Sequence, residues 1–158
     1  MSGALTIRRG TPADNLALGE VMFDAVRNGP SLYTPTQQMA WVPEPRSGAD
    51  WDTRLASQCV FVAERDGVIQ GFLTLEPPDY VDFAYIRPAS QGQGLFRRLH
   101  DAVEQEAVQR GQTRLHVHAS LMARPAFAAM GYQVAQEETV EIRGESFHRF
   151  AMEKVLGG

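Results

Sequence analysis

The stretch that decides the fold of this chain is Tyr85-Ile86-Arg87-Pro88-Ala89-Ser90-Gln91-Gly92-Gln93-Gly94-Leu95-Phe96-Arg97-Arg98-Leu99. A strand-like run ends at Pro88, a short loop with two glycines follows, and a helical pattern begins directly after Gly94. The first backbone N–H groups of a helix have no partner within the helix, and they lie at the positive end of its dipole. The junction therefore predicts a site for a phosphate or pyrophosphate.

The helix after this loop has one apolar face. Its apolar residues recur at three- and four-residue steps: Leu95, Phe96, Leu99, Ala102, Val103 and Ala107. Gly111 lies just beyond them, where a left-handed helix cap is expected. Arg97 and Arg98 fall in the first turn, where cations oppose the dipole. Their charges are either solvated or balanced by a bound polyanion, and the glycine loop favours the interpretation with a bound polyanion.

Three kinds of phosphate site compete for this loop. A P-loop needs Gly-Lys-Ser/Thr at the helix start, which Gly94-Leu95-Phe96 does not supply. A dinucleotide fingerprint needs a third glycine, and Arg97 stands in that position. It also usually follows the first strand of its fold, whereas this loop lies past the middle of the chain. The third candidate is a coenzyme A site.

The loop resembles motif A of the GNAT acetyltransferase superfamily. That motif is Gln/Arg-x-x-Gly-x-Gly/Ala after a strand that ends Val-x-Pro. Gln91 and Gly94 fill the first two positions, and Ile86 and Pro88 match the strand end. Phe96 stands where the last Gly/Ala is usual, which is a departure from the pattern.

A second signature follows at the spacing that the family leads one to expect. Residues 119–132 resemble the family's Asn-x-x-Ala, aromatic pair and Gly-Phe, the last as Gly131-Tyr132. The resemblance is firm over about residues 60–133 and loose outside them. The positions of four further residues resemble a bacterial subgroup of small family members: Tyr33, Gln37, Trp41 and Trp51.

Length and composition are those of one globular domain, which we expect to span residues 1–158. A formal charge of −4 gives no sign of a nucleic-acid binder. No apolar run approaches the ~20 residues needed to span a bilayer, and residues 1–9 lack the order of a signal peptide. We therefore expect a cytoplasmic protein that binds no membrane. Cys59, the only cysteine, is predicted to be a buried structural residue.

The order of elements predicts an α/β fold, a twisted mixed sheet of six to seven strands with helices on both faces. This is also the GNAT fold that the resemblance implies. Strands are expected at residues 5–8, 60–64, 68–75, 80–87, 114–119, 132–142 and 147–155. Helices are expected from Thr11, as N-cap, to Asn28, at 36–41, 51–57 and 95–109, and at a short segment ending at Met130.

The resemblance implies acetyl-CoA as co-substrate. Carried over from the family, the N–H of Ile86 polarises the thioester carbonyl, and the backbone of residues 91–97 holds the pyrophosphate. The expected cofactor-binding residues are Ile86, Gln91, Gly92, Gln93, Gly94, Leu95, Phe96, Arg97 and Ser120. The function implied is transfer of an acetyl group to a primary amine of a small molecule by direct attack on the thioester.

The family's usual proton donor is missing. In many relatives a tyrosine four residues before the Gly-Phe pair protonates the leaving thiolate, but here the position is Phe127. His118 and Ser120 are candidate catalytic residues, with Asp82 as a candidate base through water and solvent as the favoured acid. His116 and His118 share a strand face, yet no third ligand lies nearby in sequence, so no metal is expected.

Tyr33, Gln37 and Trp41 fall at steps of four and could share one side of a short helix. With Trp51 they form either a packed wall or an acceptor-binding pocket. The alternative function is a non-catalytic acyl-CoA-binding regulatory module, which Phe127 favours. The sequence also leaves open a different acyl-CoA as donor, an O-acceptor in place of an amine, and a homodimer. The expected partner is a small-molecule amine.

Overall fold

Seven strands form one sheet in the order β1-β2-β3-β4-β5-β7-β6 in the computed structural model, which describes residues 3–157. Only the β4–β5 pair is parallel. The strands are β1 (Thr6–Arg9), β2 (Cys59–Arg65), β3 (Val68–Glu76), β4 (Tyr80–Ile86), β5 (Arg114–Ser120), β6 (Gln133–Ile142) and β7 (Glu145–Val155). The mixed α/β sheet predicted from the sequence is thereby confirmed.

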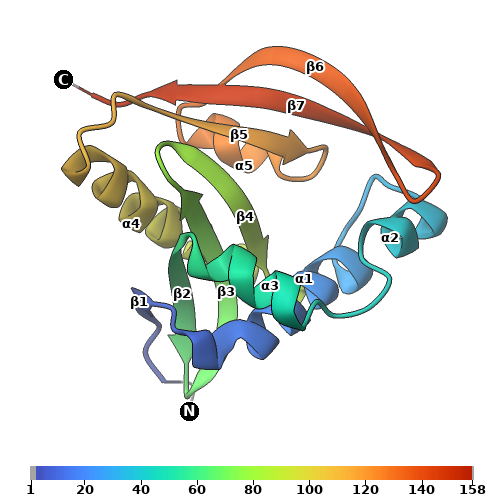
Figure 1. Cartoon of the computed structure of the whole chain (residues 1–158), viewed down its shortest axis with the longest axis horizontal. Coiled ribbons are helices and arrows are strands. Elements are labelled where there is room, and N and C mark those ends of the chain that lie inside the picture. Colours follow the sequence, from blue (N-terminus) through green and yellow to red (C-terminus); the bar gives the residue numbers. More distant parts are fainter. Residues whose placement is uncertain (1–2, 158) are drawn as a thin grey trace.

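Helices cover both faces of this sheet (Figure 1). They are α1 (Asn15–Asn28), α2 (Pro35–Trp41), α3 (Ala49–Ala56), α4 (Leu95–Gln109) and α5 (Arg124–Ala129). One core lies under α1 and α3 and centres on Leu18, Trp51 and Phe72. The other lies under α4 and α5 and includes Leu99 and Phe127. The apolar stripe predicted for α4 is the buried face of that helix.

Two details near the N-terminus differ from the expectation. Thr11 does not start the first α-helix, because residues 12–14 form a 3-10 turn and α1 begins only at Asn15. Tyr33 precedes α2, so it does not share that helix with Trp41. Their rings nevertheless meet, with centroids 5.6 Å apart.

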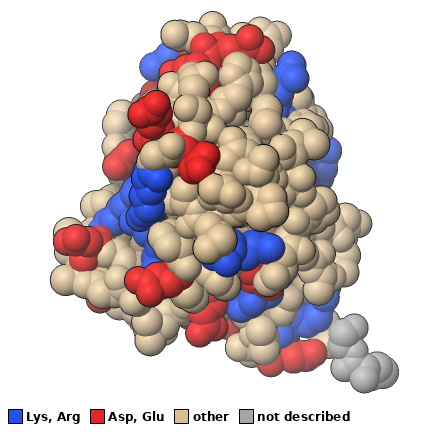
Figure 2. All heavy atoms as spheres, turned by 90° about the vertical axis from the view of Figure 1, so that its right-hand side faces the viewer, with Lys and Arg blue, Asp and Glu red and all other residues tan. Residues whose placement is uncertain are grey.

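The surface shows no long patch of one charge on the face drawn in Figure 2, where acidic and basic side chains are interspersed. Within residues 3–157, no helix is both long enough and apolar enough to cross a membrane.

A buried histidine links α4 to the strand side of the second core. His100 is 1% exposed, and its Nε2 lies 2.8 Å from the hydroxyl of Tyr132. Burial, together with the charge of Lys154, lowers the pKa of His100 from 6.5 to about 4. Carboxylates of Glu104 and Asp101 on the same helix act in the opposite direction and do not restore it.

We predict that this histidine makes the fold acid-sensitive. The unfolded chain takes up a proton at His100 near pH 6.5, and the folded protein does so only near pH 4. The contribution of His100 to the free energy of unfolding is therefore fully present above pH 6.5 and is lost as the pH falls toward 4. At pH 5 the loss is about 2 kcal/mol by proton linkage. Denaturant unfolding at pH 7 and pH 5 measures this loss of unfolding free energy, which should be smaller in His100→Gln than in the wild type. An equal loss in the two proteins would contradict the prediction.

Candidate active site

The glycine loop presents its backbone to solvent. A 3-10 turn at Pro88–Ser90 leads into it, and Gly92 and Gly94 have φ of +78° and +80°. A Cβ atom at either glycine would meet nothing within 4 Å, so space beside the backbone is open. Glycine adopts this conformation without strain, and its lack of a side chain leaves room for a ligand close to the backbone.

The first backbone donors of α4 point out of this loop. The Arg98 N–H makes the first helical bond, 3.2 Å to the Gly94 oxygen. The N–H groups of Leu95, Phe96 and Arg97 precede that bond and have no helical acceptor. Leu95 is buried, so it can contribute only its backbone to a ligand. These donors fit a pyrophosphate.

Side chains around the loop add polar groups. The Gln91 amide donates to the Ile86 oxygen over 3.3 Å, and the Arg65 guanidinium donates to the Gln93 side-chain oxygen over 3.2 Å. Arg65 lies at the end of β2, far from the loop in sequence, so the motif did not reveal it. It brings a third cation to a loop already flanked by Arg97 and Arg98.

Phe96 and Phe127, two departures from the family pattern, are in contact. Their rings meet edge to face with centroids 5.0 Å apart. Phe127 is 1% exposed and also packs on Tyr132. Each bulky residue therefore fills space beside the other, and position 127 belongs to the core.

β4 and β5 separate just beyond their start. Their pairing is limited to Tyr80 with His116 and Val81 with Val117. Arg87 N–H donates to the Gln70 oxygen on β3, 2.8 Å away. Because successive N–H groups along a strand point to opposite sides, the Ile86 N–H points away from β3, toward the opening. This is the direction that a carbonyl-polarising donor needs.

A bulge in β4 turns side chains toward one face of the sheet. Leu73 pairs with Ala84 but Leu75 pairs with Val81, so β4 has one extra residue there. The Phe83 N–H donates to the Thr74 hydroxyl, 3.0 Å away, instead of a strand carbonyl. Bulges re-aim side chains in this way, and here Tyr80, Asp82, Phe83 and Tyr85 all line one cleft.

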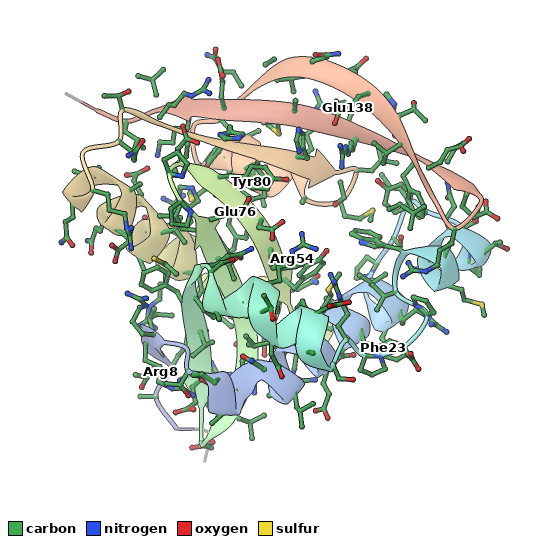
Figure 3. The ribbon with its side chains drawn as sticks, viewed as in Figure 1. Arg8, Phe23, Arg54, Glu76, Tyr80 and Glu138 are labelled. Carbon is green, nitrogen blue, oxygen red and sulfur yellow. The ribbon has the colours of Figure 1, made fainter. Side chains whose placement is uncertain are left out.

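The cleft has a volume of about 530 Å³. It lies between β4, β5, the β6–β7 hairpin and the loop before α3. Its lining includes three of the four predicted acceptor residues, Tyr33, Trp41 and Trp51. It also includes all three candidate catalytic residues, His118, Ser120 and Asp82. In Figure 3, Tyr80 and Arg54 lie in the space between α3 and β5, with Glu138 on the hairpin above.

A chain of polar contacts crosses the cleft at His118. Its Nδ1 lies 3.0 Å from the Tyr80 hydroxyl, and its Nε2 lies 3.7 Å from Glu138, which accepts a 2.6 Å bond from Arg149. Burial and the charge of Arg149 lower the pKa of His118. Burial and the charge of Asp82 raise the pKa of Tyr80. At neutral pH the imidazole of His118 is therefore neutral and the phenol of Tyr80 keeps its proton. Tyr80 was not among the site residues predicted from the sequence.

Asp82 and Ser120 have local partners. Both oxygens of Asp82 accept bonds from Arg54, at 2.7 and 2.9 Å, and one also accepts from Gln58 at 2.6 Å. Because both oxygens of Asp82 are already engaged by these donors, Asp82 is better placed to orient Arg54 than to take a proton from a substrate. The Ser120 hydroxyl accepts from the Ala123 N–H at 3.1 Å, which leaves its proton free to donate.

The four predicted acceptor residues are not equivalent. Tyr33 donates to the His148 oxygen and packs on Trp41 and Phe147. Trp51 is 1% exposed and donates to the Asn15 oxygen, so it forms the floor. Gln37 is not among the lining residues, because its amide is bound to the Ser146 oxygen and to the Thr34 N–H.

His116 shares a face of β5 with His118 but is not among the residues that line the cleft. Its Nδ1 lies 3.1 Å from Asp79, and its ring lies against Tyr80. Among residues 3–157, no three His, Cys, Asp or Glu side chains are grouped to hold a metal ion.

Cys59 lies outside the cleft, buried beneath α4, with its sulfur 3.0 Å from the Arg110 guanidinium. We predict that Cys59→Ala keeps most of the activity and lowers the free energy of unfolding by about 1 kcal/mol, the centre of the range for point mutants. Steady-state rates and denaturant unfolding measure the two effects. Complete loss of turnover in a folded variant would contradict the prediction.

The loop, the separated strands and the adjoining cleft define an acyltransferase-like site on an α/β sheet, and comparison places it in a family. Residues 33–154 match the model of the acetyltransferase (GNAT) domain. The chain therefore belongs to the GNAT acetyltransferases.

Individual relatives agree over nearly the whole chain. YafP of Escherichia coli strain K12, described as an uncharacterized N-acetyltransferase, is 29% identical over 149 residues, 94% of both chains. A GCN5-related N-acetyltransferase from Rhodopseudomonas palustris superposes with a TM-score of 0.88 at 31% identity, covering 99% of this chain and 98% of that one. YncA of Salmonella typhimurium, whose structure contains acetyl-CoA, superposes with a TM-score of 0.69 at 22% identity, covering 99% and 96%.

Proposed function

We propose that this protein is an acetyl-CoA-dependent N-acetyltransferase that acetylates a primary amine of a small molecule. The observation that carries the proposal is the meeting of two features. The donor-rich loop before α4 lies at one end of the opening between β4 and β5, and the cleft with Tyr80 and His118 adjoins that opening. The presence of acetyl-CoA in the YncA structure supports the choice of co-substrate.

The residues of the chain have separable tasks in this reaction. The backbone N–H groups of residues 95–97 bind the pyrophosphate, and the Ile86 N–H polarises the thioester carbonyl. Acetyl-CoA supplies the activated acetyl group. The incoming amine must lose its proton before it attacks, and the neutral imidazole of His118 can accept it, directly or through the Tyr80 hydroxyl.

The departing thiolate needs little help. A free cysteine thiol has a pKa of about 8.5, and a leaving thiolate of similar basicity can take a proton from water. Ser120, whose hydroxyl proton is free, is the alternative proton donor within the protein. A buried Phe127 therefore does not exclude turnover.

The competing function is a non-catalytic acyl-CoA-binding regulatory module, favoured by the phenylalanine at position 127. One experiment separates them. The purified protein is incubated with acetyl-CoA and a panel of amines, and free thiol is measured. Amine-dependent release establishes the transferase, whereas binding of acetyl-CoA by calorimetry without release for any amine establishes the module. Matched alcohols in the same panel test an O-acceptor.

A further inference from the structure

Arg46 lies in the cleft without an anionic partner. It belongs to the loop between α2 and α3, and its guanidinium lies over the rings of Trp51 and Phe83, 4.7 and 5.7 Å from their centroids. Within residues 3–157 its side chain makes no ion pair and no hydrogen bond to a side chain or backbone carbonyl.

The backbone of Arg46 lies close to α1. Its carbonyl packs so closely on α1 that a Cβ atom at Gly19 would collide with the Arg46 oxygen. Gly19 thus permits a close approach that a larger residue would prevent. The loop therefore packs on α1 at the residue whose guanidinium lies over Trp51, at the floor of the cleft.

The other arginines of the cleft are already satisfied. Arg54 is paired with Asp82, and Arg149 is paired with Glu138. Arg143 donates to the carbonyl oxygens of Ala40 and Trp41 at the end of α2. Arg46 is therefore the one cleft arginine among the described residues with no oxygen acceptor.

The surroundings make the charge of Arg46 costly. Burial is the main influence that lowers the pKa of Arg46, and the positive charge of Arg54 adds to it. A partly buried cation is stabilised when an anion binds beside it. The carboxylate of Asp82 acts in the opposite direction, but it is already bound by Arg54 and Gln58. The other carboxylates that line the same cleft, Glu44 and Asp50, are exposed and form no ion pair with Arg46.

We propose that the acceptor amine carries an anionic group, in the simplest case the carboxylate of an amino acid, and that Arg46 binds this group. The inference rests on the proposed N-acetyltransferase function and narrows its substrate. The rings of Tyr33, Trp41 and Phe147 form an apolar wall for the body of the acceptor. Its amine lies toward Tyr80 and His118, at the opening between β4 and β5.

The kinetic test uses matched acceptors that differ only in the anionic group. Each amino acid of a panel is assayed beside its amide and beside the amine that lacks the carboxylate. For carboxylated acceptors, Arg46→Met is expected to lower kcat/KM by about 10- to 100-fold, the scale of a hydrogen bond to a charged group. For the neutral counterparts it should change little, and the KM for acetyl-CoA should stay constant.

Two further variants separate charge from packing. Arg46→Lys keeps the charge and should restore part of the selectivity for carboxylated acceptors. Arg9→Met is the control, because Arg9 also lies over an aromatic ring, Phe61 at 5.2 Å, but outside the cleft. It should leave the selectivity unchanged. Thermal unfolding of each variant shows whether the fold is retained.

A binding measurement keeps this inference distinct from the proposed function. The N-acetylated amino acids and their amides are titrated into the CoA-bound protein, which requires no turnover. Tighter binding of the carboxylates, lost in Arg46→Met, supports the inference even if no amine is acetylated. Equal binding of acids and amides, no binding of any acid, or equal effects of Arg46→Met on both series overturns it, and thiol release from neutral amines would still uphold the transferase.

Discussion

Replacing Gly94 by valine is expected to weaken the binding of acetyl-CoA and of CoA by about 10²-fold, because one or two hydrogen bonds to a charged phosphate are lost. Gly94 has a φ of +80° and immediately precedes α4. A valine there must either strain the backbone or move it, and its side chain would project into the space beside the donor groups of residues 95–97. Isothermal titration of CoA measures the change.

Gly111 provides the matched control at the other end of the same helix. It also has a φ of +80°, and a Cβ atom added to it would meet nothing within 4 Å, so Gly111→Val introduces the same kind of backbone strain. It should lower stability to a similar extent and leave CoA affinity unchanged. If both valine variants lose affinity equally, the loss reports general destabilisation and the loop is not the pyrophosphate site.

The conformation of the glycine loop, the proposed cofactor site, could be predicted from the sequence because its parts are neighbours in the chain. The strand end, the glycines and the start of α4 lie within residues 85–99, and their local conformations follow from the residue types. Gly111, predicted as a left-handed cap, has the expected positive φ. Alternating patterns likewise located the strands, and with them the seven-stranded sheet.

The cleft could not be predicted in the same way. The contact of His118 with Tyr80 and Glu138 joins three strands, and the pairing of Arg149 with Glu138 depends on the register of β6 and β7. A bulge in β4 turns Tyr85 to the same side as Tyr80. No glycine or proline in β4 indicates this bulge in the sequence. Long-range pairing fixes these positions, and single-residue patterns carry little information about it.

Gln37 illustrates how a correct spacing can mislead. Its step of four from Trp41 suggested a shared wall, but its amide serves as a capping group for α2 and reaches the hairpin. Thr34 and Gln37 in fact form a capping box, which the sequence Thr-x-x-Gln signals on its own. A structural use of the side chain thus explains the residue more simply than acceptor binding.

The removal of His118 is expected to lower kcat by about 10²-fold or more, the usual contribution of a positioned acid or base. His118 is the neutral cleft imidazole in contact with Tyr80 and Glu138. Steady-state rates of His118→Ala with a good acceptor measure the effect. Tyr80→Phe, which breaks the same contact, should lower kcat in the same direction.

Three further variants show whether the loss of kcat in His118→Ala is specific to His118. His116→Ala is the matched control, because His116 lies on the same strand and packs on Tyr80 but does not line the cleft. Ser120→Ala should stay near the wild-type rate if water protonates the thiolate. Phe127→Tyr should gain no rate, because Phe127 is buried against Phe96 and a hydroxyl there would have to find a partner in the core.

The pH dependence distinguishes a base at His118 from a merely structural histidine. Burial and Arg149 keep the pKa of His118 below 6.5 in the folded protein. Activity is therefore expected to be constant above about pH 6.5, the usual histidine value, and to fall at lower pH as the imidazole is protonated. That acidic limb should disappear in His118→Ala and persist in His116→Ala and Ser120→Ala. Rates near wild type in both His118→Ala and Ser120→Ala would leave solvent as the agent of every proton transfer, with the chain acting through binding and orientation alone.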